Sequence, residues 1–214
     1  SKIIKQKGFW KDIFYTDENT LDPRSDSEIL IESIINDFNN LKDTQFNFID
    51  LCCGTGCLGI SLLKEFKSSK CDFIDISSQA LLNCKKNISD LSVKNRSSIF
   101  ESDLFENYPI SKIKDISFII CNPPYIPTGK YILLDNETLY DPKISLDGGP
   151  KGLDLYIRII DFLVTQQFKG DIFFEIDPII MKELDKFLLE KAIKIVYKKQ
   201  DYLNLDRLLK ITFP

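Results

Sequence analysis

Histidine is absent from the sequence, and methionine and tryptophan each occur only once. Without an imidazole, the chain lacks the side chain that most often acts as a general base or nucleophile near neutral pH. Six cysteines are present, but no two of them are spaced as C-x-x-C, so a zinc site would need thiolates and carboxylates alone. We therefore expect no metal.

Long apolar runs and an excess of basic residues are also missing. No segment approaches the roughly 18–20 apolar residues that a membrane-spanning helix needs. The chain has 28 Lys and Arg against 32 Asp and Glu, a net charge of −4, whereas binding a long nucleic acid normally requires a basic face. We expect neither a membrane nor a long nucleic acid as partner. The cysteines fall in or beside apolar segments, which fits a reducing, cytoplasmic location.

Apolar strands and helical patterns alternate along most of the chain. Strands are predicted at 46–52, 71–76, 98–100, 116–121, 171–176, 193–197 and 208–213. A helix is predicted at 58–66, and a second, with Ser78 as its cap, extends to about residue 88. A third helix begins at Asp177-Pro178, which supplies a cap and an N1 proline. Buried strands separated by helices indicate βαβ units, and the short last connection indicates an antiparallel pair. We predict an α/β fold with a doubly wound, mostly parallel seven-stranded sheet and an antiparallel C-terminal edge pair.

Residues 1–40 differ from the rest. They begin with an aromatic, strand-like stretch, turn at Asp22-Pro23 and continue into a helix predicted over 28–38, with Ser25 and Glu28 as a capping box. We predict that residues 1–40 lead into a domain that spans 41–214 and carries the site. The longest irregular stretch, residues 126–151, follows a strand and has the length of a functional lid.

Residues with distinctive chemistry follow four successive strands, at ends that a parallel sheet brings to one edge, where ligands bind. These are Asp50 with the loop Cys52-Cys53-Gly54-Thr55-Gly56, Asp75, Asp103, and Asn122-Pro123-Pro124-Tyr125. Residues 54–59, GTGCLG, match the G-x-G-x-x-G fingerprint, whose glycines let the backbone approach a ligand. With Asp75 placed for ribose hydroxyls, this pattern serves both NAD and S-adenosylmethionine. The Asp50 carboxylate is unfavourable beside a pyrophosphate and suits a sulfonium.

The Asn-Pro-Pro-Tyr stretch narrows the chemistry. Its two prolines stiffen the backbone and remove two N–H donors, so the Asn122 side-chain oxygen and the Pro123 carbonyl can both face outward as acceptors. Two fixed acceptors suit a planar –NH2 group, which has two donors, and the Tyr125 ring can stack on its plane. The alternative is that Asn-Pro-Pro-Tyr is an ordinary proline-rich turn. The position of the stretch at the end of the fourth strand favours a binding site instead.

Together these motifs resemble the class I S-adenosylmethionine-dependent methyltransferases with an N-P-P-Y motif, which methylate exocyclic or amide nitrogens. Three further stretches are similar to the glutamine-N5 methyltransferases that modify peptide chain release factors: GFWKDIFYTDENTLDPRSDSEILIE, LYDPKISLDGGPKGLDLYIRII and KKQDYLNLDRLLKI. The resemblance covers about residues 8–213. It implies methyl transfer from S-adenosylmethionine, with S-adenosylhomocysteine as product, to the glutamine of a release factor Gly-Gly-Gln (GGQ) motif.

The resemblance also implies roles for individual residues. Asn122, Pro123 and Tyr125 would act in catalysis, and with Pro124 they would hold the substrate amide. Asp75 would bind the ribose hydroxyls, Asp103 or its backbone the adenine amino group, and Leu104 the adenine face. The cofactor set implied in full is Asp50, Cys52, Cys53, Gly54, Thr55, Gly56, Asp75, Asp103, Leu104 and Asn122.

The sequence departs from the family pattern in three places. The family normally has a helical N-terminal substrate-recognition domain, which is not part of this sequence. The family's E-I-G reads Glu175-Ile176-Asp177, and Cys52-Cys53 replaces a loop usually richer in Gly and Thr. DLCCGTGC and DPRS are also similar to ribosomal-protein glutamine methyltransferases. That substrate therefore stays open, as do a DNA or RNA amino-group methyltransferase acting on a flipped base, an NAD-dependent oxidoreductase and a non-catalytic adaptor.

Overall fold

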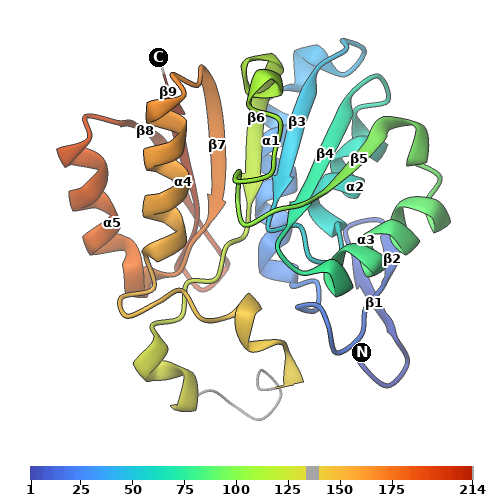
Figure 1. Cartoon of the computed structure of the whole chain (residues 1–214), viewed down its shortest axis with the longest axis horizontal. Helices are drawn as coiled ribbons and strands as arrows, with labels where there is room; N and C mark the ends of the chain where they lie inside the picture. The colour runs from blue at the N-terminus through green and yellow to red at the C-terminus, as the bar shows by residue number, and fades with distance from the viewer. Residues whose placement is uncertain (134–139, 214) are drawn as a thin grey trace.

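Seven strands form the central sheet of the computed structural model, which describes residues 1–133 and 140–213 (Figure 1). They are β3 (Asn47–Leu51), β4 (Lys70–Asp75), β5 (Ser97–Glu101), β6 (Ile116–Cys121), β7 (Gly170–Glu175), β8 (Lys194–Gln200) and β9 (Asp206–Phe213). Their order in the sheet is β5-β4-β3-β6-β7-β9-β8. The first five are parallel, and β9 pairs antiparallel with both β7 and β8. The predicted sheet and its antiparallel edge pair are confirmed.

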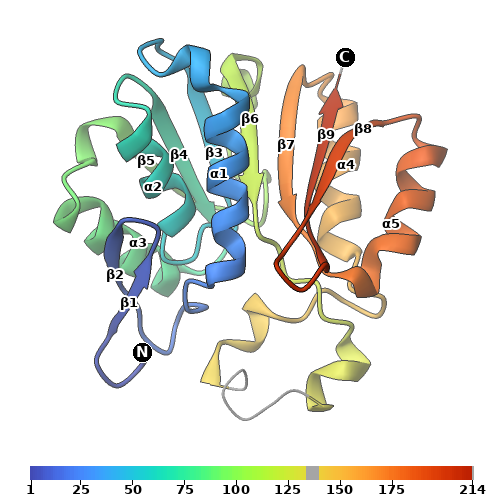
Figure 2. The ribbon, with the colours of Figure 1, turned by 180° about the vertical axis from the view of Figure 1, so that it is seen from behind.

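Helices cover both faces of this sheet. α1 (Glu28–Asp37), α2 (Cys57–Glu65) and α3 (Ser78–Asp90) lie on one face, while α4 (Asp154–Thr165) and α5 (Pro178–Glu190) lie on the other (Figures 1 and 2). Strand side chains alternate between the two cores: Phe118 joins the α1–α3 side and Ile119 the α4–α5 side, both fully buried. Burial on both faces explains why the strands are continuous apolar runs. Among the described residues, no helix is long and apolar enough to cross a bilayer.

The N-terminal segment packs onto the same fold. β1 (Gln6–Phe9) and β2 (Asp12–Tyr15) form a hairpin, and α1 contacts α2, β7 and β9. α1 thus belongs to the helix layer, although the boundary predicted at residue 40 remains a prediction.

Two of the three predicted helix caps are corrected by the structure. The capping box is wrong, because Glu28 Oε1 accepts the backbone N–H of Trp10 at 2.8 Å and no side chain caps α1. Ser77 rather than Ser78 caps α3, since its hydroxyl accepts the N–H of Ala80. The Asp177 cap of α5, with proline at N1, is confirmed. α4 was not among the predicted helices.

The sheet order reverses between β3 and β6. Chain connections leave these two neighbours in opposite directions, β3 toward β4 and β5, and β6 toward β7. Such a switch point opens a crevice outside the carboxyl ends of the strands. The predicted site residues lie at those ends.

Candidate active site

A cavity of about 760 Å³ lies over the carboxyl ends of β3, β4 and β6. Nine of the predicted site residues line it: Cys52, Cys53, Gly54, Thr55, Asp75, Asp103, Leu104, Asn122 and Pro124. Four others, Asp50, Gly56, Pro123 and Tyr125, do not line it. Its size lies within the range of small-molecule sites. The cavity therefore joins strand ends that are distant in the sequence.

The Asp75 carboxylate fixes the glycine loop. Its Oδ2 accepts the N–H of Gly54 at 2.8 Å, and its Oδ1 accepts the N–H of Ser77 at 2.9 Å. Burial raises the pKa of Asp75, and the N–H donors of Ser77 and Gly54 partly offset that rise. Each carboxylate oxygen can still accept a second hydrogen bond, so Asp75 can bind hydroxyl groups in the cavity while it holds the loop.

Two glycines are required where the loop becomes α2. Gly56 has φ +76°, and a Cβ there would lie 2.7 Å from Cys84 Sγ. A Cβ at Gly59 would lie 2.5 Å from Phe73 Cε1. These glycines let α2 pack closely against α3 and β4, which is the packing role of such a fingerprint.

Asp50 lies beneath the loop instead of in the cavity. Its side chain is 0% exposed, and its Oδ2 accepts the N–H of Gly59 at 2.8 Å. Burial raises the pKa of Asp50 well above its ordinary value, against the opposing effect of the Gly59 N–H. Its role in this structure is to anchor the first turn of α2. Direct contact with a cofactor stays a prediction that the geometry does not favour.

The β5 end forms the opposite wall. Asp103 lines the cavity, and its Oδ2 lies 2.9 Å from Arg158 Nη2. Leu104 adopts φ +51° and lines the cavity beside Ile74 and Ile76. This part of the cavity is thus lined by apolar side chains and by the Asp103 carboxylate. Such a lining suits a flat heterocycle that carries an amino group.

The Asn-Pro-Pro-Tyr turn continues β6 into the cavity. Asn122 and Pro124 line it, whereas Pro123 is buried and does not line it. Tyr125 is half-buried against the α4–α5 core, and burial with nearby Glu175 raises the pKa of its hydroxyl. The predicted stacking of Tyr125 on a substrate amide remains a prediction.

The segment after residue 140 returns to brace this turn. Ile126 N–H donates to the Leu146 carbonyl at 3.0 Å, and Gly148 N–H donates to the Ile126 carbonyl at 2.9 Å. A Cβ on Gly148 would lie 2.6 Å from the Pro124 carbonyl oxygen. The glycines of LDGGPKG therefore allow backbone-to-backbone contact with Asn-Pro-Pro-Tyr. The described part of residues 126–151 braces the turn through these contacts, and its action as a lid remains a prediction; residues 134–139 lie outside the described residues.

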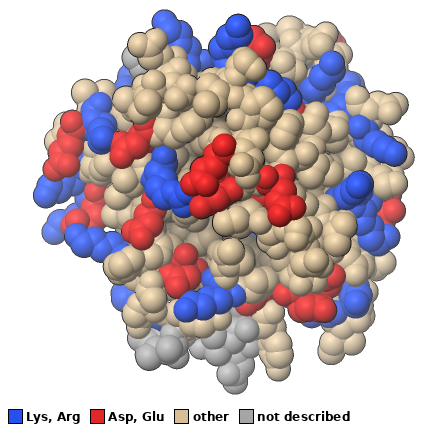
Figure 3. Space-filling view, viewed as in Figure 1, with Lys and Arg blue, Asp and Glu red and all other residues tan. Residues whose placement is uncertain are grey.

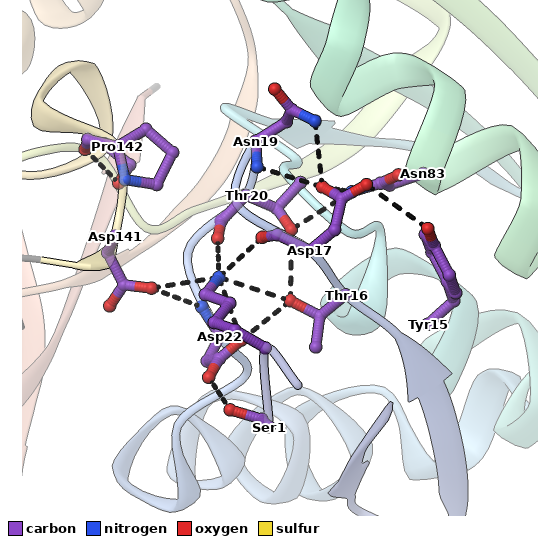
Figure 4. A network of polar contacts seen from close by, with 12 residues as sticks. Ser1, Tyr15, Thr16, Asp17, Asn19, Thr20, Asp22, Asn83, Asp141 and Pro142 are labelled. Carbon is purple, nitrogen blue, oxygen red and sulfur yellow. Dashed lines mark hydrogen bonds and ion pairs between the residues drawn. The ribbon is translucent and has the colours of Figure 1, made fainter. Parts of the chain in front are cut away.

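The sequence prediction missed the third wall, which residues 19–24 form. Figure 4 shows how a polar network holds it. Asp141 pairs with Arg24 Nη2 at 2.6 Å and with Lys2 Nζ at 3.1 Å, and Asp17 accepts from Asn83 of α3 at 2.7 Å. The sequence predicts only a turn at Asp22-Pro23 and a family resemblance for the D-P-R stretch, and it gives no role to these ion pairs. The contacts of this stretch span more than a hundred residues, so no local pattern predicts them.

The cysteines are free thiols in the structure. All except Cys52 are buried, and burial raises the pKa of Cys53, Cys71 and Cys121. Such thiols pack as small apolar groups. Within residues 1–133 and 140–213, no cluster of three His, Cys, Asp or Glu side chains is arranged to hold a metal ion.

Comparisons with known proteins show that the chain is a methyltransferase domain. Residues 18–134, more than half of the chain, match the family model described as methyltransferase small domain. The human METTL16 catalytic domain, solved with a MAT2A 3′UTR hairpin, covers 94% of this chain and 75% of its own at a TM-score of 0.71. Its sequence identity is 14%, so the likeness shows the shared fold alone.

Curated relatives then narrow the family. The release factor glutamine methyltransferase of Clostridium acetobutylicum is 30% identical over 92% of this chain and 68% of its own length. That of Caulobacter vibrioides is 30% identical over 81% and 58%. The ribosomal protein uL3 glutamine methyltransferase of Francisella tularensis is 34% identical over 74% and 49%. The chain belongs to the release factor glutamine methyltransferase family, and it spans about half to two thirds of the length of these relatives.

Proposed function

We propose that this chain transfers a methyl group from S-adenosylmethionine to the side-chain amide nitrogen (N5) of a glutamine in the GGQ motif of a peptide chain release factor. The observation that carries the proposal is that Asn122 and Pro124 of the Asn-Pro-Pro-Tyr turn line the same cavity as Asp75 and the glycine loop. Family membership supports the reaction. A translation factor as substrate would place the reaction in the cytoplasm.

The cavity fits the cofactor. Asp75 would accept the ribose hydroxyls, and the apolar wall at Ile76 and Leu104 would enclose the adenine beside Asp103. The loop at Cys53 and Gly54 would surround the methionine part. Bound there, S-adenosylmethionine supplies an electrophilic methyl group on a sulfonium.

The chain's own contribution is to hold the acceptor nitrogen. A primary amide is a poor nucleophile because its lone pair is delocalised, and no side chain deprotonates it at neutral pH. Asn122 Oδ1 and the Pro123 carbonyl would accept its two N–H bonds, fix its direction and stabilise the positive charge that develops on it as the nitrogen–methyl bond forms and the sulfur–methyl bond breaks. The methylated nitrogen would then release one proton to solvent, leaving the methylamide and S-adenosylhomocysteine. This mechanism needs no histidine, in agreement with the composition.

A ribosomal-protein glutamine is the second candidate, favoured by the 34% identity with the uL3 enzyme of Francisella. A nucleic acid is less favoured. On the face in Figure 3, Lys and Arg are mixed with Asp and Glu instead of forming a continuous basic patch. An NAD-dependent oxidoreductase leaves the Asn-Pro-Pro-Tyr turn without a role, and an adaptor would not need the braced geometry around Asn122.

The test is methyl transfer from labelled S-adenosylmethionine to a bacterial release factor, beside the same factor with the GGQ glutamine changed to alanine. Protein uL3 and duplex DNA run in parallel. Label that disappears with the glutamine supports the proposal. Label on uL3 or DNA alone would overturn the substrate, and no label on any of them despite cofactor binding would overturn the activity for this chain.

A further inference from the structure

Glu175 is a buried carboxyl group next to the Asn-Pro-Pro-Tyr turn that the mechanism above does not use. It ends β7 and is 3% exposed. Cys121 of β6 is paired in register with Phe174, so Asn122 and Glu175 are the next neighbours along the two parallel strands. The alternation that turns Phe173 toward the α1 side turns Glu175 to that side as well, where its carboxylate meets Ser27. The Asn122 side-chain amide lies close enough to the Glu175 carboxylate to lower its pKa.

Contacts from three other elements hold Glu175 in place. The Ser27 hydroxyl, just before α1, donates to its Oε2. The Tyr156 hydroxyl of α4 donates to its backbone carbonyl at 2.7 Å, and the next residue, Ile176, donates to the Arg207 carbonyl of β9 at 2.9 Å. Since each neighbour is itself packed, the carboxylate has little freedom to move.

A carboxylate determines which way an asparagine amide faces. An ionised carboxylate only accepts hydrogen bonds, so it must receive the Asn122 NH2 group and leave Oδ1 for other partners. Asn122 lines the cavity, where the proposed substrate amide presents two N–H donors and needs acceptors. If the Asn122 amide were turned over, its NH2 would meet the substrate's NH2.

We propose that Glu175 is a positioning residue for methyl transfer, which fixes the Asn122 amide with its oxygen toward the substrate. The inference rests on the proposed function and deepens it. Ser27 and Glu175 then connect the segment before α1 to the reacting group, and both belong to stretches outside the Asn-Pro-Pro-Tyr motif.

The proposal has a pH signature, because only the ionised carboxylate enforces this orientation. Burial raises the pKa of Glu175 to about 7, opposed by the Ser27 hydroxyl and the Arg207 guanidinium and aided by Asp26. Arg207 is itself shared among Asp26, Asp177 and Asp201 at 3.8, 3.1 and 2.9 Å. The Tyr125 hydroxyl also lies close enough for Glu175 to raise its pKa. We expect the methylation rate to rise with pH through about 7 and then level off.

The experiment compares Glu175→Gln with Glu101→Gln, an exposed glutamate that ends β5 in the same way. Glu175→Gln is expected to lower kcat about 10- to 100-fold, the scale of a misplaced reacting group. Cofactor affinity is expected to stay unchanged, and the rise near pH 7 is expected to disappear. Glu101→Gln should match the wild type. A Glu175→Gln enzyme with wild-type kcat and pH profile would overturn the proposal.

A second readout does not depend on activity. In ¹H–¹⁵N spectra, the Asn122 side-chain NH2 pair, assigned by its loss in Asn122→Ala, should titrate near pH 7 in the wild type. Ser27→Ala, which removes a donor to the carboxylate, should move that midpoint to higher pH even if Glu175→Gln does not fold. An Asn122 pair that does not titrate would sink the inference, whereas titration without methyl transfer to any substrate would implicate the proposed function instead.

Discussion

The two ends of the cavity are built in different ways. At the β3–β4 end, contacts are local: the Asp75 carboxylate takes N–H groups from Gly54 and Ser77, within about twenty residues of it. At the β6–β7 end, Glu175 is held by Ser27, 148 residues away in sequence. The first end is a loop with its own internal bonds. The second is assembled only when the whole chain has folded, so we expect substitutions there to affect catalysis without disturbing cofactor binding.

Asn122→Ala tests this separation most strongly. Loss of the amide oxygen that faces the substrate is expected to lower the methylation rate by about 100- to 1000-fold, the range found when one preorganised polar group is removed from a transition state. Affinity for S-adenosylhomocysteine, measured by calorimetry, should stay nearly constant. Asn39→Ala, at an exposed position, is the matched control. Comparable losses in rate and cofactor affinity would show that the two ends act as one unit.

Glu175 is expected to have a large effect on stability as well as on rate. Its pKa is raised from 4.5 to about 7 in the folded protein. Between these values the folded protein keeps a proton that the unfolded chain releases, so the free energy of unfolding falls as pH rises, by on the order of 3 kcal/mol in total. Urea unfolding at pH 5, 6, 7 and 8 measures this fall.

Glu175→Gln removes the titrating group. As pH rises from 4.5 to about 7, the free energy of unfolding of the wild type should therefore fall relative to that of the variant. The exposed Glu101→Gln variant should instead run parallel to the wild type. Parallel curves for Glu175→Gln would mean that the carboxyl group titrates at its ordinary pKa. The polar contacts at the β6–β7 end would then stabilise the ionised carboxylate strongly enough to cancel the effect of burial on its pKa.

Asp75→Asn, at the β3–β4 end, is expected to affect cofactor binding and not the rate. A hydrogen bond to a charged group contributes about 1.5–3 kcal/mol, so cofactor affinity is expected to fall roughly 10- to 100-fold. At saturating cofactor, kcat should change little. Asp90→Asn, at an exposed position at the end of α3, provides the control. If Asp75→Asn lowered kcat and left cofactor affinity unchanged, the β3–β4 end would serve catalysis instead of cofactor binding.

The contrast between local and long-range contacts also explains which features the sequence could predict. β6 and the Asp177 cap depend on neighbouring residues, and both agree with the prediction. Local pattern also located Asp75, but not Asp50, because motif spacing does not tell whether a side chain faces the cavity or the core beneath it. Asp177, where the family has glycine, adopts an extended φ of −120° that any residue tolerates, so the departure needs no compensation.

Long-range partners escaped prediction. Arg24 and Asp141 are 117 residues apart and meet only through the fold. Ser27 is a second example, because the local pattern predicts a cap from Ser25 and Glu28 and gives Ser27 no role, whereas its hydroxyl bonds to a residue 148 positions away. Its true partner, Glu175, lies on a strand that the sequence placed correctly but could not align in register with Asn122.

Gly148→Ala probes this long-range assembly with the smallest expected effect. The new Cβ would lie 2.6 Å from the Pro124 carbonyl oxygen and 2.8 Å from Tyr125 Cα, both backbone groups that move only with the turn. Overpacking of this kind costs about 1–3 kcal/mol in the free energy of unfolding. Gly129→Ala is the matched control, because a Cβ there meets nothing within 4 Å.

Displacement of the turn by Gly148→Ala should lower the methylation rate while the cofactor affinity set by Asp75 stays as it was. Thermal unfolding, calorimetry and initial rates on the two glycine variants separate these effects. A Gly148→Ala protein that loses stability but keeps its full rate would mean that the brace stabilises the fold without positioning Asn122. The alignment of the acceptor would then depend on Glu175 alone.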